Sequence, residues 1–138
     1  MLGMEDAEHE ESAPNASSLL ISRLSCSLVG ITQRIKIRPG TLVHQVYQQE
    51  EVTEEFRCNY GLNPRYRDKI SNSGFKIAGI DVDGEVRIVE LSEHRFFIAT
   101  LFLPQLCSTT ETPHPIIIGY LKAAQAFRTL QSRSEINL

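Results

Sequence analysis

Polar and apolar residues alternate through the middle of the chain in a pattern that predicts several short strands. Residues 33–38 alternate strictly, which is typical of a strand with one face in solvent. Residues 52–60 alternate more loosely and predict a second strand. Residues 75–80 and 85–91 are joined by an Asp-Gly turn, and this pattern predicts a β-hairpin because the dipeptide favours a tight turn.

Three other segments predict helices. Residues 41–47 place several apolar side chains on one side of a short helix. Asn63 and Pro64 suit the beginning of a helix that runs to about residue 72, with Gly74 as its stop. Residues 115–130 predict a final helix, and residues 131–138 predict a polar, frayed tail. The final helix carries an apolar face made of Ile117, Tyr120, Leu121, Ala124 and Phe127.

The most apolar run, residues 96–102, predicts a strand that is buried on both faces and lies centrally in an α/β sheet. Ligand sites in such sheets lie beyond the C-terminal ends of the strands, so Leu103, Gln105 and the following loop stand where chemistry is expected. Neither of these two side chains performs acid–base chemistry. Residues 19–29 are ambiguous and fit either a strand or an irregular covering segment.

Composition narrows the class of protein. The 138 residues fit one domain, which begins with an acidic loop segment over residues 1–18. A formal net charge of −3 gives no electrostatic footprint for nucleic acid. No apolar run approaches the roughly 20 residues of a membrane span, and the acidic beginning does not fit a signal peptide. These features predict a cytoplasmic protein with reduced thiols and without a metal or cofactor.

An ordered series of short motifs extends from the first residues to about residue 127. It comprises residues 4–7, Glu11, residues 37–42, Tyr47, Glu54, Arg57, Tyr60, Asn63, residues 73–75, Gly79, residues 89–91, His94, Phe96, Phe97, Phe102, Pro104, His114, Pro115 and residues 122–124. This series resembles the C-terminal half of the class I glutamine amidotransferase domain of CTP synthase. It is most similar to the CTP synthase C-terminal-region-related proteins, some of which are thought to carry selenocysteine.

The resemblance implies an α/β fold of the class I glutamine amidotransferase type, a flavodoxin-like sandwich. The chain would form a single partial domain over residues 1–138, the C-terminal portion, with a mixed sheet and flanking helices. Such domains hydrolyse glutamine through a cysteine thiolate, a histidine and a carboxylate. The family places the histidine and the carboxylate in a Phe-His-Pro-Glu motif, whereas this chain has Leu103 and Gln105 at those two positions. Loss of even one triad member typically costs several orders of magnitude in rate.

The resemblance also marks positions for substrate recognition. Glu11 matches the family carboxylate that binds the substrate α-amino group, and Tyr60 lies beside the substrate clamp. The family arginine that holds the substrate carboxylate falls at Asn59, which cannot replace its bidentate contact. Arg57 matches another basic family position, but on a strand it would point to the opposite face.

The family nucleophile lies on a segment upstream of the part that this chain resembles. Two explanations are expected: the chain is a fragment of a longer protein, or it is complete and repacks against a partner. The partner would be a second copy or the missing N-terminal half of the domain, since an unpaired apolar strand is an aggregation hazard.

Three cysteines are the remaining candidates for chemistry. Cys58 lies next to a basic residue that would favour its thiolate, and Cys107 follows the expected strand end, whereas Cys26 fits a small core residue. A thiol redox role would require Cys58 and Cys107 within bonding reach. His114 precedes a proline and is expected to cap the last helix.

The sequence therefore predicts a catalytically degenerate glutaminase-like protein, not an active enzyme, that binds an amino-acid-like ligand or a protein partner. One alternative is a working glutamine amidotransferase component of pyrimidine nucleotide biosynthesis, with its nucleophile on a missing segment or another chain. The other alternative is a thiol redox protein on the same scaffold.

Overall fold

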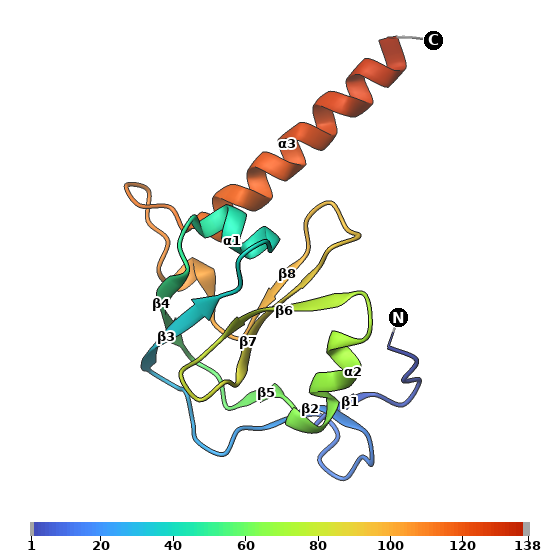
Figure 1. Ribbon diagram of the computed structural model, residues 1–138, viewed down its shortest axis with the longest axis vertical. Helices are drawn as coiled ribbons and strands as arrows, with labels where there is room; N and C mark the ends of the chain where they lie inside the picture. The colour runs from blue at the N-terminus through green and yellow to red at the C-terminus, as the bar shows by residue number, and fades with distance from the viewer. Residues whose placement is uncertain (1, 137–138) are drawn as a thin grey trace.

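The computed structural model describes residues 2–136, which form two β-sheets and three α-helices (Figure 1). The larger sheet has five strands in the order β4-β3-β6-β7-β8, and the smaller has three in the order β1-β2-β5. The elements are β1 (Glu8–His9), β2 (Leu19–Arg23), β3 (Ile31–Ile37), α1 (Leu42–Tyr47), β4 (Glu51–Phe56), β5 (Tyr60–Leu62), α2 (Arg67–Ser71), β6 (Phe75–Ile80), β7 (Val86–Leu91), β8 (Ile98–Thr100) and α3 (Pro115–Ile136). Short 3-10 turns at Pro64–Tyr66 and Pro104–Leu106 complete the described part.

Every strand pair in the larger sheet is antiparallel. The expected mixture of strand directions is therefore wrong for this sheet and holds only for the smaller one, where β1 is parallel and β5 antiparallel to β2. The connections explain the difference, because β3–β4 and β6–β7 are joined by short local links, and parallel neighbours need a crossover of a dozen or more residues. The site rule for parallel sheets consequently does not apply to the end of β8.

The β6–β7 hairpin has the predicted position and is organised by a buried aspartate. The carboxylate of Asp81 accepts hydrogen bonds from the backbone N–H groups of Asp83 and Glu85 at 3.0 and 2.9 Å. Its second oxygen accepts one from Arg87 Nη2 at 2.7 Å, and both side chains of this ion pair are buried. Gly84 supplies the positive φ of 82° that the turn requires. One carboxylate thus holds the turn and the first residues of β7 together.

The core lies between the larger sheet and helix α1. The alternation predicted for residues 33–38 is confirmed, since Ile35 and Ile37 on β3 are buried and Lys36 between them is exposed. Helix α1 begins as predicted at residue 41, where the Thr41 hydroxyl accepts from the His44 N–H at 3.1 Å. The remaining buried apolar members are Leu28, Val43, Tyr47, Val52, Phe56, Ala78, Ile88, Phe102 and Ile116.

The segment predicted as one strand over residues 52–60 is two strands in different sheets. β4 ends at Phe56 and β5 begins at Tyr60, so the one-strand prediction is wrong. The chain changes sheets here because the carbonyls of Cys58 and Asn59 accept from Leu28 and Leu24 of the covering segment rather than from a strand. The ambiguous residues 19–29 turn out to be both predicted alternatives in succession, a strand to Arg23 and then irregular chain.

The apolar run at residues 96–102 is not a central strand. Only Ile98–Thr100 pair, with β7 alone, and β8 is the edge of the five-stranded sheet. Phe97 is 37% exposed, whereas Phe102 is buried against Phe56 with ring centroids 5.7 Å apart. Apolar content alone could not distinguish a strand buried on both faces from an edge strand beside an apolar groove.

Helix α3 leads away from the sheets, and its second half lies beyond the other elements (Figure 1). It begins at Pro115 as predicted but continues to Ile136, so residues 131–136 are helical rather than frayed; residues 137 and 138 lie outside the described part. The predicted apolar face is largely uncovered, because Tyr120 and Leu121 are 58% and 54% exposed. Arg95 covers Phe127, with its guanidinium carbon 3.9 Å from the ring centroid.

No helix within residues 2–136 is both long enough and apolar enough to cross a membrane. The acidic segment at residues 1–18 is not only loop, since it contains β1.

We expect Arg87→Ala to destabilise the fold by about 3–5 kcal/mol, because it leaves the buried Asp81 carboxylate without its cation. The matched control is Arg34→Ala, which removes the exposed ion pair of Arg34 with Glu51 and should cost about 0–1 kcal/mol. Urea denaturation followed by circular dichroism measures both values. Equal losses for the two variants would contradict the assignment of Asp81 as the organiser of the hairpin.

Candidate functional site

The smaller sheet gathers polar side chains from three separate segments. The ring of His9 on β1 lies 5.2 Å from the ring of Tyr60 on β5, measured between centroids. The guanidinium carbon of Arg23 on β2 lies 5.6 Å from the centroid of the same tyrosine ring, and its Nη2 donates to the tyrosine hydroxyl at 3.4 Å. Glu10 accepts from the Arg23 backbone N–H at 2.5 Å. A tyrosine, an arginine and a histidine therefore share one exposed surface.

Glu11 lies at the edge of this cluster. Its backbone N–H donates to His9 Nδ1 at 3.1 Å, and its carboxylate is exposed and forms no ion pair within the described residues. Asn59 is also exposed and contributes its backbone carbonyl to Leu24. The structure thus brings Glu11 and Tyr60 into one neighbourhood, with the unpredicted Arg23 between the strands.

Arg57 is occupied elsewhere. Its Nη2 and Nε donate to one oxygen of Glu55 at 2.7 and 3.1 Å, on the exposed end of β4. The guanidinium is therefore held by a neighbour two residues away, and Tyr60 finds its arginine partner in Arg23 instead.

The tip beyond β8 carries Leu103 and Gln105, and both are exposed. The chain forms a 3-10 turn here, in which the Leu106 N–H donates to the Leu103 carbonyl at 3.0 Å. The Gln105 side chain forms no hydrogen bond within residues 2–136. A leucine and an amide offer neither a proton acceptor nor a charge to orient one.

The three cysteines are free thiols, and Cys26 and Cys107 are exposed. The expected burial of Cys26 as a core residue is therefore wrong, because it lies in the irregular segment after β2. Cys58 is half-buried and donates through its sulfur to the Tyr60 carbonyl at 3.0 Å. Across the described residues, no group of three histidine, cysteine or acidic side chains is arranged to hold a metal ion.

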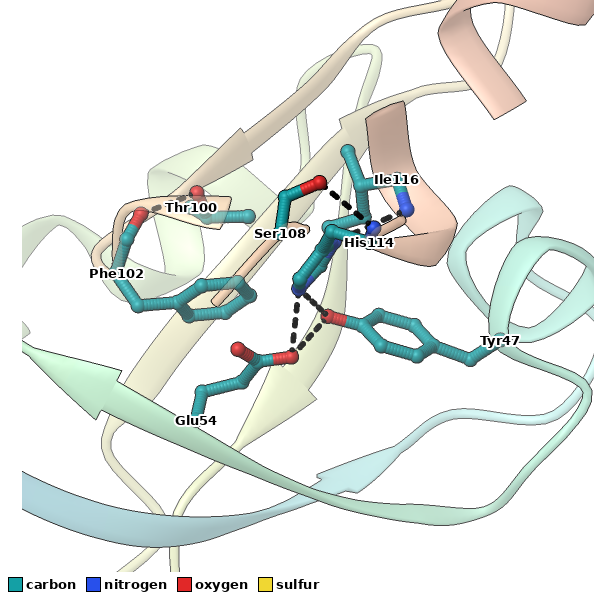
Figure 2. Close-up of polar contacts among 7 residues, drawn as sticks. All are labelled: Tyr47, Glu54, Thr100, Phe102, Ser108, His114 and Ile116. Carbon is teal, nitrogen blue, oxygen red and sulfur yellow. Dashed lines mark hydrogen bonds and ion pairs between the residues drawn. The ribbon is translucent and has the colours of Figure 1, made fainter. Parts of the chain in front are cut away.

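A second polar cluster is buried in the core and joins three elements (Figure 2). Glu54 on β4 uses one oxygen, Oε1, to accept from the Tyr47 hydroxyl at 2.5 Å and to contact His114 Nε2 at 3.0 Å. The tyrosine hydroxyl and the histidine nitrogen are 3.4 Å apart. All three residues are at most 8% exposed.

The hydrogen bonds assign the protonation state of His114. The backbone N–H of Ile116 donates to Nδ1 at 3.2 Å, which requires an unprotonated Nδ1. The proton therefore sits on Nε2 and is donated to Glu54, so that the ring is neutral. The backbone N–H of His114 donates to the Ser108 hydroxyl at 3.0 Å. The predicted capping role of His114 at the last helix is confirmed by the bond to Ile116.

Burial raises the pKa of Tyr47 well above its ordinary value of about 10, and the hydrogen bond and negative charge of Glu54 raise it further. The negative charge of a Cys107 thiolate adds a smaller contribution in the same direction. Tyr47 therefore remains a neutral donor to the carboxylate. Because solvent does not reach the three side chains, this cluster stabilises the fold and does not bind substrate.

The role of Glu54 has a signal in the sequence that the strand analysis did not use. Val52, Glu54 and Phe56 occupy alternate positions, and all three are buried on one face of β4. A carboxylate in the buried register of a strand requires donors. Tyr47 and His114 are the donors, but their distance along the chain hides the pairing.

No family model matches the chain. The CTP synthase of Nostoc punctiforme is 35% identical over 134 residues, and that of Saccharolobus solfataricus is 33% identical over 132 residues. These alignments cover 90% and 89% of the chain but 25% of each relative, so the chain spans about a quarter of the length of the curated relatives it matches.

Two solved structures share the fold. The glutaminase domain of Trypanosoma brucei CTPS with bound acivicin aligns with a TM-score of 0.84 at 23% identity, over 91% of this chain and 53% of that chain. A GMP synthase component from Thermoplasma acidophilum aligns with a TM-score of 0.61 at 13% identity, over 81% of this chain and 51% of that chain.

We expect Tyr47→Phe to lower the free energy of unfolding by about 1–3 kcal/mol, because it removes one of the two donors to a buried carboxylate. Tyr120→Phe is the matched control, since that hydroxyl lies on an exposed residue and forms no hydrogen bond in the described chain; it should change stability by less than about 0.5 kcal/mol. Thermal and urea unfolding give the two values. A Tyr47→Phe protein as stable as the control would show that the carboxylate does not depend on this donor.

Proposed function

Because the chain is homologous to the glutaminase domain of CTP synthase, we propose that it is a glutaminase-domain-like protein that does not itself hydrolyse glutamine. The observation that carries this proposal is the tip beyond β8, where Leu103 and Gln105 replace a histidine and a glutamate of the motif that the family uses. Neither side chain can relay a proton, and each is exposed without a polar partner that could substitute.

No other histidine of the described chain takes over the role. His114 is buried and committed to Glu54 and Ile116, and His94 contacts the carbonyl of Phe96 at 3.1 Å. His9 accepts from the Glu11 N–H through Nδ1 and lies in the smaller sheet. The tip of β8 therefore lacks a base both in sequence and in space.

We propose further that the cluster on the smaller sheet binds an amino-acid-like ligand without reacting with it. The Glu11 carboxylate can hold an ammonium group, and the Arg23 guanidinium, positioned by Tyr60, can hold a carboxylate. These opposite charges lie on neighbouring segments, which suits a zwitterion. Arg57 is not part of this proposal, because Glu55 already neutralises it.

The purified protein should release no ammonia from L-glutamine above the background without protein. In isothermal titration it should bind L-glutamine, and Arg23→Gln should weaken this binding about tenfold or more, since a charge-assisted bond of roughly 1.5–3 kcal/mol is lost. Arg57→Gln is the matched control and should bind as the unaltered protein does. Ammonia release with turnover would refute the loss of hydrolysis, and equal effects of the two variants would refute the ligand site.

A second candidate function, binding of a protein partner, is favoured by an apolar groove beside the edge strand β8. The groove has a volume of about 280 Å³. Its apolar lining includes Leu20, Ile21, Leu62, Phe75, Phe97 and Leu101. A free strand edge next to an apolar groove can accept an added strand. The occupant we propose is a segment equivalent to the half of the T. brucei glutaminase domain that has no counterpart in the aligned chain.

Mixing the protein with that half-domain should give a 1:1 complex in size-exclusion chromatography. Phe97→Asp should abolish the complex because it places a charge in the groove, while Val82→Asp, on the exposed hairpin turn, should leave it intact. Self-association that Phe97→Asp removes would instead assign the groove to a second copy and overturn this proposal.

A further inference from the structure

A groove between α2 and the strands β3 and β6 collects positive charge on a protein whose net charge is −3. Its volume is about 360 Å³, within the range of small-molecule pockets. Lys36, Arg38 and Arg67 contribute its three charged side chains, and no acidic side chain lines it. This local excess runs against the balance of the whole chain.

The strand geometry places two of these cations side by side. Lys36 and Arg38 are two residues apart along β3 and its continuation, where the Arg38 N–H still donates to the Ala78 carbonyl of β6 at 2.8 Å. Side chains two positions apart on paired, extended chain lie on the same face. The two side chains are exposed, and neither forms an ion pair within the described residues.

The third cation comes from the helix that covers the groove. Arg67 Nη1 donates to the Gly84 carbonyl at 2.5 Å, which fixes the position of the guanidinium at the first residue of α2. Its remaining N–H groups form no hydrogen bond with any described residue. Ser71, one helical turn further on, lines the same groove with a hydroxyl that is equally unused.

The acidic residues nearby do not neutralise these cations. Glu51 is paired with Lys36 across the β3–β4 ladder, but its carboxylate contacts Arg34 at 3.4 Å and lies outside the groove. Asp68 follows Arg67 on α2 and is not part of the lining. Three cations therefore converge without a counter-charge, and their mutual repulsion is relieved when an anion binds.

We propose that this groove binds the phosphate group of a small phosphorylated metabolite. The planar guanidinium groups of Arg38 and Arg67 match the geometry of phosphate oxygens, and Lys36 adds a point charge. The rest of the lining is apolar, with Ile37, Ile77 and Ile80 available to contact the body of the molecule. The site is independent of the proposed amino-acid-like ligand, because no residue of the smaller sheet lines it.

The test is isothermal titration of the whole chain at low salt with inorganic phosphate, glucose 6-phosphate and uridine 5′-monophosphate, and with glucose and uridine as uncharged controls. The phosphate esters should bind and the two uncharged compounds should not. Tighter binding of one ester than of inorganic phosphate identifies the body that contacts the isoleucines. Binding of no phosphate compound would overturn the proposal.

Variants on a single strand supply the matched control. Lys36→Gln and Arg38→Gln should each weaken binding of the esters about tenfold, whereas Arg34→Gln, on the same strand but paired with Glu51, should leave it within about twofold. All three positions are exposed, so the fold should persist, which circular dichroism checks. Equal losses at Arg34 and Arg38 would show a diffuse charge effect and overturn the assignment to the groove.

Discussion

The arrangement of helices on the larger sheet depends on one oxygen atom. Oε1 of Glu54 accepts from Tyr47 on α1 and from His114 at the beginning of α3, while its backbone belongs to β4. An unpaired buried carboxylate is costly, so the two donors must be present for the strand to keep its register. His114 in turn uses its other ring nitrogen to begin α3. A strand, a helix and the origin of a second helix are thereby placed relative to each other by two short contacts.

This dependence separates the form of the fold from its chemistry. The interior of the chain supports an amidotransferase-type architecture with a TM-score of 0.84 to a glutaminase domain, yet the tip of β8 presents a leucine and a glutamine to solvent. Fold and activity reside in different residues, and function must be argued from the site. The polar groups that remain accessible are on the smaller sheet and in the basic groove, and both suit binding better than bond cleavage.

The sequence predicted the elements whose signals are local. The alternation of β3, the Asp-Gly turn of the hairpin, the start of α1 at Thr41 and the cap at Asn63 each act within a few residues, and the structure shows all of them. Predictions that required knowledge of neighbours were wrong: the apolar run around β8 looked central but lies at an edge, and residues 52–60 divide between two sheets. The Glu54 cluster and the position of Arg23 beside Tyr60 depend on contacts between distant segments, which periodicity does not encode.

The Asp81 turn and the Glu54 cluster differ in how much chain must be organised before each can form. Asp81 joins groups no more than six residues away, so the hairpin can acquire these bonds early in folding. Glu54 and His114 are 60 residues apart, and closing such a loop carries a larger entropic cost. We infer an order of assembly in which the hairpin forms first and the carboxylate closes the structure late. The hairpin then governs how fast the chain folds, and the buried carboxylate governs how long the folded state lasts.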